Sequence, residues 1–115
     1  MDKSIFINLL GTSPKTKVLD FLIDNIISDY TKGDIAKETG ISMATLDSFW
    51  KQLSELGIIK ETRRLGRATL YTLNRETEIV KKMIEFDFAL SKDYANKSAD
   101  AQNSITAGKK ALAYA

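Results

Sequence analysis

Residues 31–73 read TKGDIAKETGISMATLDSFWKQLSELGIIKETRRLGRATLYTL, and the fold can be inferred from this stretch. Thr31 and Asp34 have the spacing of a capping box, so a helix is expected to begin at Thr31. Gly40 can adopt the left-handed conformation that ends this helix, and Ser42 can cap the next one. The sequence therefore predicts two helices that meet across a tight turn at residues 40–42.

The second helix of this pair is expected to run from Ser42 to Gly57, and its side chains divide into two faces. One face is apolar and is expected to pack in the core: Leu46, Phe49, Trp50 and Leu53. The opposite face is small, polar or charged: Ala44, Asp47, Ser48, Lys51 and Glu55. Trp50 could stack on a ligand or a base, but its position among the apolar residues favours core packing.

After Gly57 the spacing of the apolar residues is no longer that of a helix, which predicts a two-stranded hairpin. Residues 58–62 and 68–73 are rich in β-branched and aromatic side chains, and Arg63–Arg67 separates them with Gly66 near the tip. Tyr71 and Leu73 are expected to face the helices, with Leu70 and Thr72 on the other side. From residue 60 to residue 75 there are five basic side chains and one acidic one, against a net charge of +2 for the whole chain. The hairpin is thus a concentrated positive surface.

Further helices are expected on both sides of this unit. Ser13 and Pro14 predict the start of a helix that ends near Ser28, and Asn74 is the expected cap of a final helix that ends near Leu90. We divide the chain into an apolar segment (1–12, strand or helix), a central domain (13–74), a final helix (75–91) and a frayed helix or disordered tail (92–115). The predicted fold class is mainly α with a small β-hairpin.

Composition excludes several classes of function. The 115 residues suit one domain, and they include no cysteine and no histidine. Thiol nucleophiles, Ser–His–Asp triads and zinc sites built from His or Cys are therefore impossible. We find no acidic cluster or phosphate-cradling glycine loop in the sequence, so no enzyme and no cofactor is expected. No stretch resembles a membrane span or a secretory signal, which predicts a cytoplasmic protein without membrane contact.

The order helix, glycine turn, helix and hairpin resembles a winged helix-turn-helix, in particular the MarR-like and ArsR-like regulators of prokaryotes. The resemblance covers about residues 14–90. It is carried by Ile35-Ala36, Gly40-Ile41-Ser42, Thr45-Leu46, Leu53, Gly57-Ile58-Ile59, Gly66-Arg67 and Tyr71-Thr72-Leu73. It implies a sequence-specific regulator of transcription that binds double-stranded DNA. The helix that begins at Ser42 would lie in the major groove, and the hairpin, or wing, on the backbone or in the minor groove.

The resemblance also implies which residues contact DNA. The recognition positions fall on Ser42, Met43, Ala44, Asp47, Ser48 and Lys51. Ser48 and Lys51 could reach base edges, and Met43 or Ala44 could contact a thymine methyl group. In the wing, Arg63, Arg64 and Arg67 are expected to reach phosphates or a narrow minor groove. Further backbone contacts are predicted for Lys15, Lys17 and Lys32, which lie near helix starts.

The charge of the recognition helix keeps other interpretations open. It has one lysine against Asp47 and Glu55, and phosphates would repel these acids unless one accepts a hydrogen bond from a cytosine amine. Its exposed face could instead be solvated or contact a protein. Two alternative functions follow, a winged-helix adaptor for proteins and a DNA-coating or plasmid-partition protein with weak sequence preference.

The final helix predicts a homodimer, because its two adjacent apolar seams exceed what one small domain can cover. The candidate interface residues are Ile5, Ile7, Ile79, Val80, Met83, Ile84, Phe86, Phe88 and Leu90. The alternative is that these residues close the core of a single chain. Phe86, Phe88 and Tyr94 could line an effector pocket, but aromatic residues at helical spacing more often belong to a core or an interface. The sequence identifies no effector.

Overall fold

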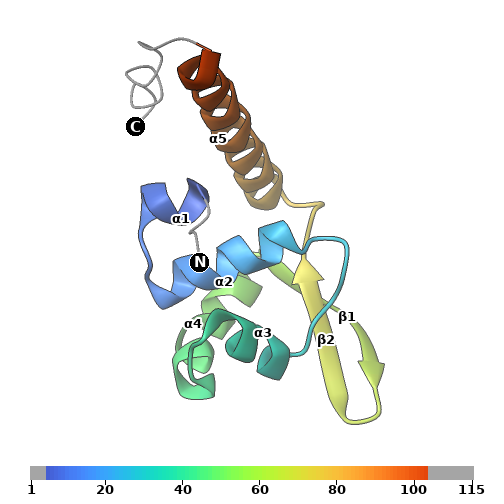
Figure 1. The fold of residues 1–115 in the computed structure, drawn as a ribbon. Coiled ribbons are helices and arrows are strands. Elements are labelled where there is room, and N and C mark those ends of the chain that lie inside the picture. Colours follow the sequence, from blue (N-terminus) through green and yellow to red (C-terminus); the bar gives the residue numbers. More distant parts are fainter. Residues whose placement is uncertain (1–4, 104–115) are drawn as a thin grey trace.

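The structure, a computed structural model, describes residues 5–103, with side chains described as far as Asn96. Five helices and one hairpin follow each other along the described chain (Figure 1). They are α1 (Ile5–Leu10), α2 (Pro14–Asp24), α3 (Lys32–Thr39), α4 (Met43–Glu55), β1 (Ile59–Leu65), β2 (Ala68–Leu73) and α5 (Glu78–Asn103). The predicted class, mainly α with a small hairpin, is confirmed.

The capped helix pair forms as its sequence predicts. The Thr31 hydroxyl accepts a hydrogen bond from the Asp34 amide at 3.0 Å, and the Asp34 carboxylate accepts one from the Thr31 amide at 3.3 Å. Gly40 ends α3 with φ of 74°, a conformation that costs glycine little. The Ser42 hydroxyl then accepts a hydrogen bond from the Thr45 amide at 3.0 Å. These local bonds set where α3 ends and α4 begins.

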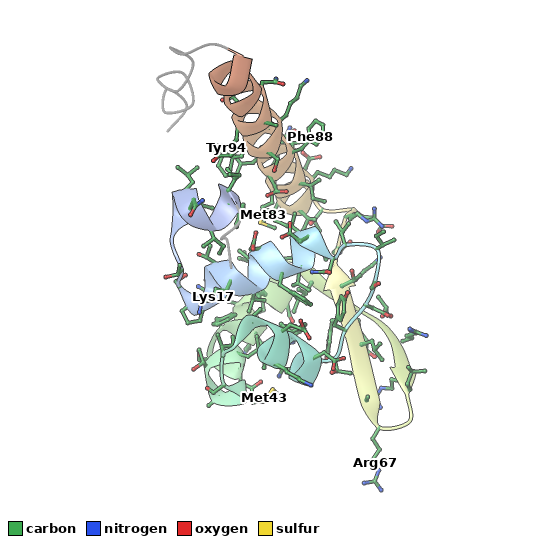
Figure 2. The ribbon with its side chains drawn as sticks, viewed as in Figure 1. Lys17, Met43, Arg67, Met83, Phe88 and Tyr94 are labelled. Atoms are coloured by element: carbon green, nitrogen blue, oxygen red, sulfur yellow. The ribbon has the colours of Figure 1, made fainter. Side chains whose placement is uncertain are left out.

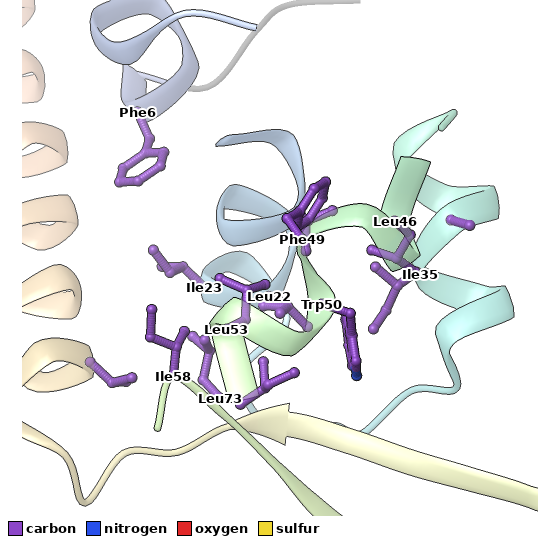
Figure 3. Packing of buried hydrophobic residues seen from close by; sticks show 14 residues of the cluster. Phe6, Leu22, Ile23, Ile35, Leu46, Phe49, Trp50, Leu53, Ile58 and Leu73 are labelled. Carbon is purple, nitrogen blue, oxygen red and sulfur yellow. The ribbon is translucent and has the colours of Figure 1, made fainter. Parts of the chain in front are cut away.

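The core lies between α2, α3, α4 and the base of the hairpin (Figure 3). Its buried side chains come from every element of the domain: Phe6, Val18, Leu22, Ile23, Ile35, Ala36, Leu46, Phe49, Trp50, Leu53, Ile58, Ile59, Leu73 and Val80. Trp50 is 8% exposed, so the prediction that it belongs to the core is confirmed.

The first strand of the hairpin is longer than predicted, and the turn is shorter. β1 continues to Leu65, which places Arg63 and Arg64 within a strand, and the turn itself is formed by Gly66 and Arg67. The pairing with β2 shifts between Glu61 and Arg63, as in a β-bulge. A bulge increases the local twist and interrupts the alternation of faces. Leu70, expected on the face away from the helices, is also buried.

The helix ends differ from the predicted ones where side chains form local bonds. α2 ends at Asp24, before the expected Ser28, and the Asn25 side chain donates a hydrogen bond to the Phe21 carbonyl. Asn74 does not cap α5. Its side-chain oxygen accepts a hydrogen bond from the Glu76 amide, whereas the Thr77 hydroxyl accepts one from the Val80 amide at the start of the helix.

The N-terminal segment and the final helix pack together. Residues 5–10 form a helix, α1, that contacts α2 and α5. Phe6 of α1 is buried, and its ring meets that of Phe86 in α5 edge to face, with the ring centroids 6.4 Å apart. α5 continues to Asn103, so residues 92–103, expected as a frayed helix or tail, are helical; residues 1–4 and 104–115 lie outside the described part. Within that part, no helix is long and apolar enough to cross a membrane.

Three carboxylates meet where α2 approaches α5. Asp20, Asp24 and Asp87 have carboxylate oxygens within 4.8 Å of one another. The sequence analysis found no acidic cluster, because Asp87 is distant from the other two along the chain. Partial burial of Asp24 raises the pKa of its carboxyl group to about 6, and repulsion from Asp20 and Asp87 adds to this effect. Burial likewise raises the pKa of Asp87, with a further contribution from Asp20.

We expect Asp24→Asn to stabilise the protein at neutral pH. Between the ordinary pKa of 3.8 and the folded value of about 6, the folded chain keeps a proton that the unfolded chain releases. Stability therefore falls as pH rises through this window and stays lowered above it. Because Asp24 is largely exposed to solvent, the gain at pH 7 is only about 1 kcal/mol.

Urea denaturation at pH 7 and pH 4 measures this effect. The stability difference between variant and wild type should nearly vanish at pH 4, and Glu38→Gln, an exposed change on α3, serves as the control. Equal differences at both pH values would contradict the role given to the Asp24 carboxylate.

Candidate nucleic-acid interface

The start of α4 and the tip of the wing lie on the same side of the molecule. Figure 2 shows Met43 and Arg67 on this side, with Phe88 and Tyr94 toward the opposite end, on α5. Met43 is 43% exposed, and Arg67 occupies the turn between the two strands. The structure thus brings together the two elements that the sequence analysis assigned to one surface.

Most of the predicted recognition residues are exposed on α4. Ala44 and Ser48 are exposed, and the Ser48 hydroxyl donates a hydrogen bond to the Thr45 carbonyl at 2.5 Å. The Lys51 side chain is 86% exposed, with its ammonium group 3.9 Å from the Glu55 carboxylate. Ser42 is also exposed, and its oxygen caps the helix. This face can therefore offer a lysine ammonium group and small side chains to a major groove.

Lys32, one of the predicted backbone contacts, is engaged by another residue of the chain. Its ammonium group forms an ion pair with Oδ1 of Asp47, and the Lys32 side chain is only 28% exposed. The same nitrogen lies 5.4 Å from the centre of the Trp50 ring. Lys32 therefore joins the start of α3 to the exposed face of α4. A sequence pattern near a helix start could not reveal this partner, because the two residues meet only when the helices pack.

The two lysines on α2 have different surroundings. The Lys15 ammonium group donates a hydrogen bond to the Gln52 side-chain oxygen of α4 at 2.7 Å and lies 5.9 Å from the centre of the Phe49 ring. Lys17 is half-buried, and Figure 2 shows it on α2. Lys15 thus lies beside α4.

The three wing arginines are not equivalent. Arg63, placed near the tip by the sequence analysis, lies within β1 and forms a bidentate ion pair with Asp29, through Nε at 2.9 Å and Nη2 at 3.1 Å. Arg64 has Nε 3.8 Å from the Glu61 carboxylate. Arg67 forms no ion pair with any residue of the described chain, and Figure 2 shows it pointing away from the body of the protein. Arg67 is therefore the most available of the three cations.

Asp29 holds the base of the wing against the loop between α2 and α3. Its carboxylate accepts hydrogen bonds from Arg63 and, at 2.5 Å, from the Thr62 hydroxyl at the bulge. These bonds lower the pKa of Asp29 to about 2 and raise the pKa of Arg63. We call Asp29, Thr62 and Arg63 the wing clamp. The sequence analysis missed Asp29, which lies 34 residues before Arg63 and has no local motif around it.

Three further hydrogen bonds reinforce the wing clamp. Tyr30 and Tyr71 exchange a pair of backbone hydrogen bonds of 2.8 and 2.9 Å, which adds one residue of the loop to the edge of β2. The Thr72 hydroxyl also donates to the Ser28 carbonyl at 3.2 Å. The base of the wing is thus connected to the helical body at several points.

The predicted dimer residues separate into buried and exposed groups. Ile7, Val80 and Leu90 are buried within this chain, and Ile5, Met83 and Ile84 are half-buried. Of these, Val80 belongs to the core, and Met83 and Ile84 pack against it. Four apolar side chains of α5 remain exposed: Ile79, Phe86, Phe88 and Tyr94. At about 100° per residue they do not share one face. Ile79, Phe86 and Tyr94 lie toward one side, where Phe86 meets Phe6 of α1, and Phe88 lies on the other. Phe88 is 67% exposed and is the most exposed of the four.

Comparisons with known proteins give a family and a fold. Residues 4–110 match the family described as Firmicute plasmid replication protein (RepL). No match was found among curated proteins. A solved structure of a mutant of S. aureus MepR bound to an oligodeoxyribonucleotide is similar, with a TM-score of 0.59 and 20% identity, over 96% of this chain and 78% of that one.

Two other solved structures give the same result. Wild-type ZitR of Lactococcus lactis in complex with DNA has a TM-score of 0.55 and 19% identity, over 91% of this chain and 68% of that one. The adhesin competence repressor (AdcR) of Streptococcus pyogenes has a TM-score of 0.56 and 20% identity, over 81% of this chain and 67% of that one. In three structures of ZitR mutants the chain spans 60 to 67% of the ZitR length. These likenesses confirm the predicted winged helix-turn-helix fold.

We expect Asp29→Ala to loosen the wing. The change removes both acceptors of the wing clamp, so the amides of β1 and β2 should exchange with solvent faster while those of α2 and α4 keep their rates. Hydrogen–deuterium exchange measures this, with Glu61→Ala on the same strand as control. Unchanged exchange in the hairpin would mean that the clamp does not hold the wing.

Proposed function

The chain belongs to the RepL family of Firmicute plasmid replication proteins, and we propose that it binds double-stranded DNA at a specific sequence. The observation that carries this proposal is the position of the exposed face of α4 and of Arg67 on one side of the molecule. The DNA complexes of MepR and ZitR, two proteins of the same fold, support it. Such binding can serve the control of transcription, as the resemblance implies, or replication, as the family description states.

In the proposed complex, α4 lies in the major groove. Ser48 and Lys51 would reach base edges, and Met43 and Ala44 would present apolar surface to a thymine methyl group. The hydroxyl of Ser42, which caps α4, lies at the end of the helix where backbone amides favour phosphate contacts. Side chains on a rigid helix that packs through Leu46 and Trp50 have fixed relative positions, which suits the reading of a sequence.

The wing would contact the backbone or the minor groove next to α4. Arg67 at the turn is the primary phosphate or minor-groove contact, because it is exposed and not engaged by an acid of the described chain. Arg64 could add a second contact, since its pairing with Glu61 is long and solvent-exposed. Arg63 acts differently, by holding the wing in place. Lys15, beside α4, and Lys17 on α2 remain candidates for backbone contacts.

We further propose that two copies associate through the side of α5 that carries Phe88. A two-fold dimer would bury Phe88 and leave both recognition helices free for half-sites about 34 Å apart, one turn of DNA. Figure 2 supports this arrangement, because Phe88 and Tyr94 lie far from Arg67. The dimer would then bind a site with approximate two-fold symmetry.

Selection of bound duplexes from a random pool tests the proposed function. A short, two-fold symmetric consensus and a footprint that saturates at that site would support it. A footprint that spreads with protein concentration would instead favour the DNA-coating or plasmid-partition alternative. A protein that shifts no duplex at either low or moderate salt would favour the adaptor for proteins.

We expect Arg67→Ala to weaken binding to all duplexes alike. Loss of one phosphate contact should reduce the slope of log K against log salt by about one unit, whereas the selected consensus should remain the same. Filter binding at several salt concentrations measures the slope, with Lys92→Ala on α5 as the matched loss of one exposed charge. A slope equal to that of wild type would remove Arg67 from the interface.

We expect Phe88→Ser to convert a dimer to a monomer. The side chain is 67% exposed, so the change should leave the thermal unfolding of the monomer fold intact while removing the apolar area that joins two copies. Sedimentation equilibrium measures the mass, and Leu56→Ser, an exposed leucine at the end of α4, is the control. A dimer that persists in the Phe88 variant would place the interface elsewhere.

A further inference from the structure

An ion pair changes the electrostatics of the recognition helix. Within α4 there is one lysine against two acids, which is unfavourable for a helix between two rows of phosphates. Asp47, however, does not face the DNA side as a lone negative charge. Lys32 of α3 contacts its Oδ1 atom and compensates the charge from the protein side.

Lys32 is held in place by the start of α3, by the Asp47 carboxylate and by the ring of Trp50. It is the first residue of α3, and the capping box of Thr31 and Asp34 fixes that end of the helix. Its ammonium group lies between the Asp47 carboxylate and the indole ring of Trp50, whose centre is 5.4 Å away. The side chain is 28% exposed, compared with 86% for Lys51, so Lys32 is held in place while Lys51 projects into solvent. A cation over an aromatic ring gains further stabilisation when it is partly desolvated.

Asp47 itself remains accessible. Its side chain is 54% exposed, and it projects from the same face as Ala44, Ser48 and Lys51. The pair therefore leaves a carboxylate whose orientation is fixed by Lys32 and whose outward oxygen lone pairs meet solvent. This arrangement can accept a hydrogen bond without adding a free negative charge to the interface.

In the major groove, a carboxylate is complementary to cytosine. The cytosine N4 amine donates hydrogen bonds, whereas guanine N7 and O6 and thymine O4 are acceptors that repel a carboxylate. Adenine has a donor at N6 beside an acceptor at N7, which suits an asparagine side chain better than a carboxylate. An acid held at this position thus selects against three of the four bases.

We propose that Asp47 reads a cytosine in the major groove and that Lys32 is the residue that positions it. The inference rests on the proposed function and assigns one base contact within it. Lys32 acts through Asp47 and Trp50 and does not touch a phosphate. Asp47 is a specificity-determining residue, and its pair with Lys32 is what makes an acid tolerable in this interface.

Three variants and one control test the proposal by selection from the same random duplex pool. Asp47→Asn should replace cytosine by adenine at one position of each half-site and leave the other positions unchanged. Wild type should prefer cytosine there by about tenfold or more, as expected for one good base contact. Lys32→Met should reduce both this preference and the affinity for every duplex, because Asp47 is left uncompensated. Lys32→Arg, which can keep the pair, should largely restore both.

Glu55→Gln is the matched control, because Glu55 is the other acid of α4 and its pair with Lys51 is longer and more exposed. It should leave the consensus unchanged. Thermal unfolding of every variant shows whether a change in binding reflects loss of the fold, and a change of base preference at one position is not expected from a purely structural role. An enriched site that Asp47→Asn leaves unaltered overturns this inference alone. A wild-type protein that enriches no sequence overturns the proposed function, and this inference with it.

Discussion

The contacts of one side chain, Trp50, set the relative positions of the elements that form the candidate DNA surface. Trp50 projects from α4 into the core. Its ring and that of Tyr71 in β2 meet edge to face, with their centroids 5.1 Å apart, and the Lys32 ammonium group of α3 lies over the indole. One aromatic residue therefore touches both helices of the helix-turn-helix and the wing. Because cores are packed as tightly as organic crystals, the position of each element constrains the others.

The wing depends on a second connection outside the core. Asp29 binds Arg63 and Thr62 at the bulge, so part of the positive charge in this region is used to hold the hairpin. Residues 60–75 therefore offer less positive charge to a ligand than a count of their basic side chains suggests. Arg67 at the turn provides available charge, and Arg63 provides orientation. The same residue type thus serves two purposes in one hairpin.

The final helix connects the described fold to the proposed second copy. α5 packs in the core through Val80, while Phe88 and Tyr94 remain exposed at the end far from the wing. Separation of these surfaces means that association of two copies need not obstruct DNA. A plasmid replication protein that recognises a two-fold symmetric site would require both surfaces at once.

The sequence alone determined the features that arise between near neighbours: the capping box at Thr31, the left-handed stop at Gly40 and the membership of Trp50 in an apolar face. Hydrogen bonds over three or four residues and helical periodicity need no knowledge of distant contacts. Only the tertiary structure decided that Lys32 pairs with Asp47 and Arg63 with Asp29. A charge pattern shows that a residue can form an ion pair, but the partner is chosen by which side chains packing brings within a few ångströms.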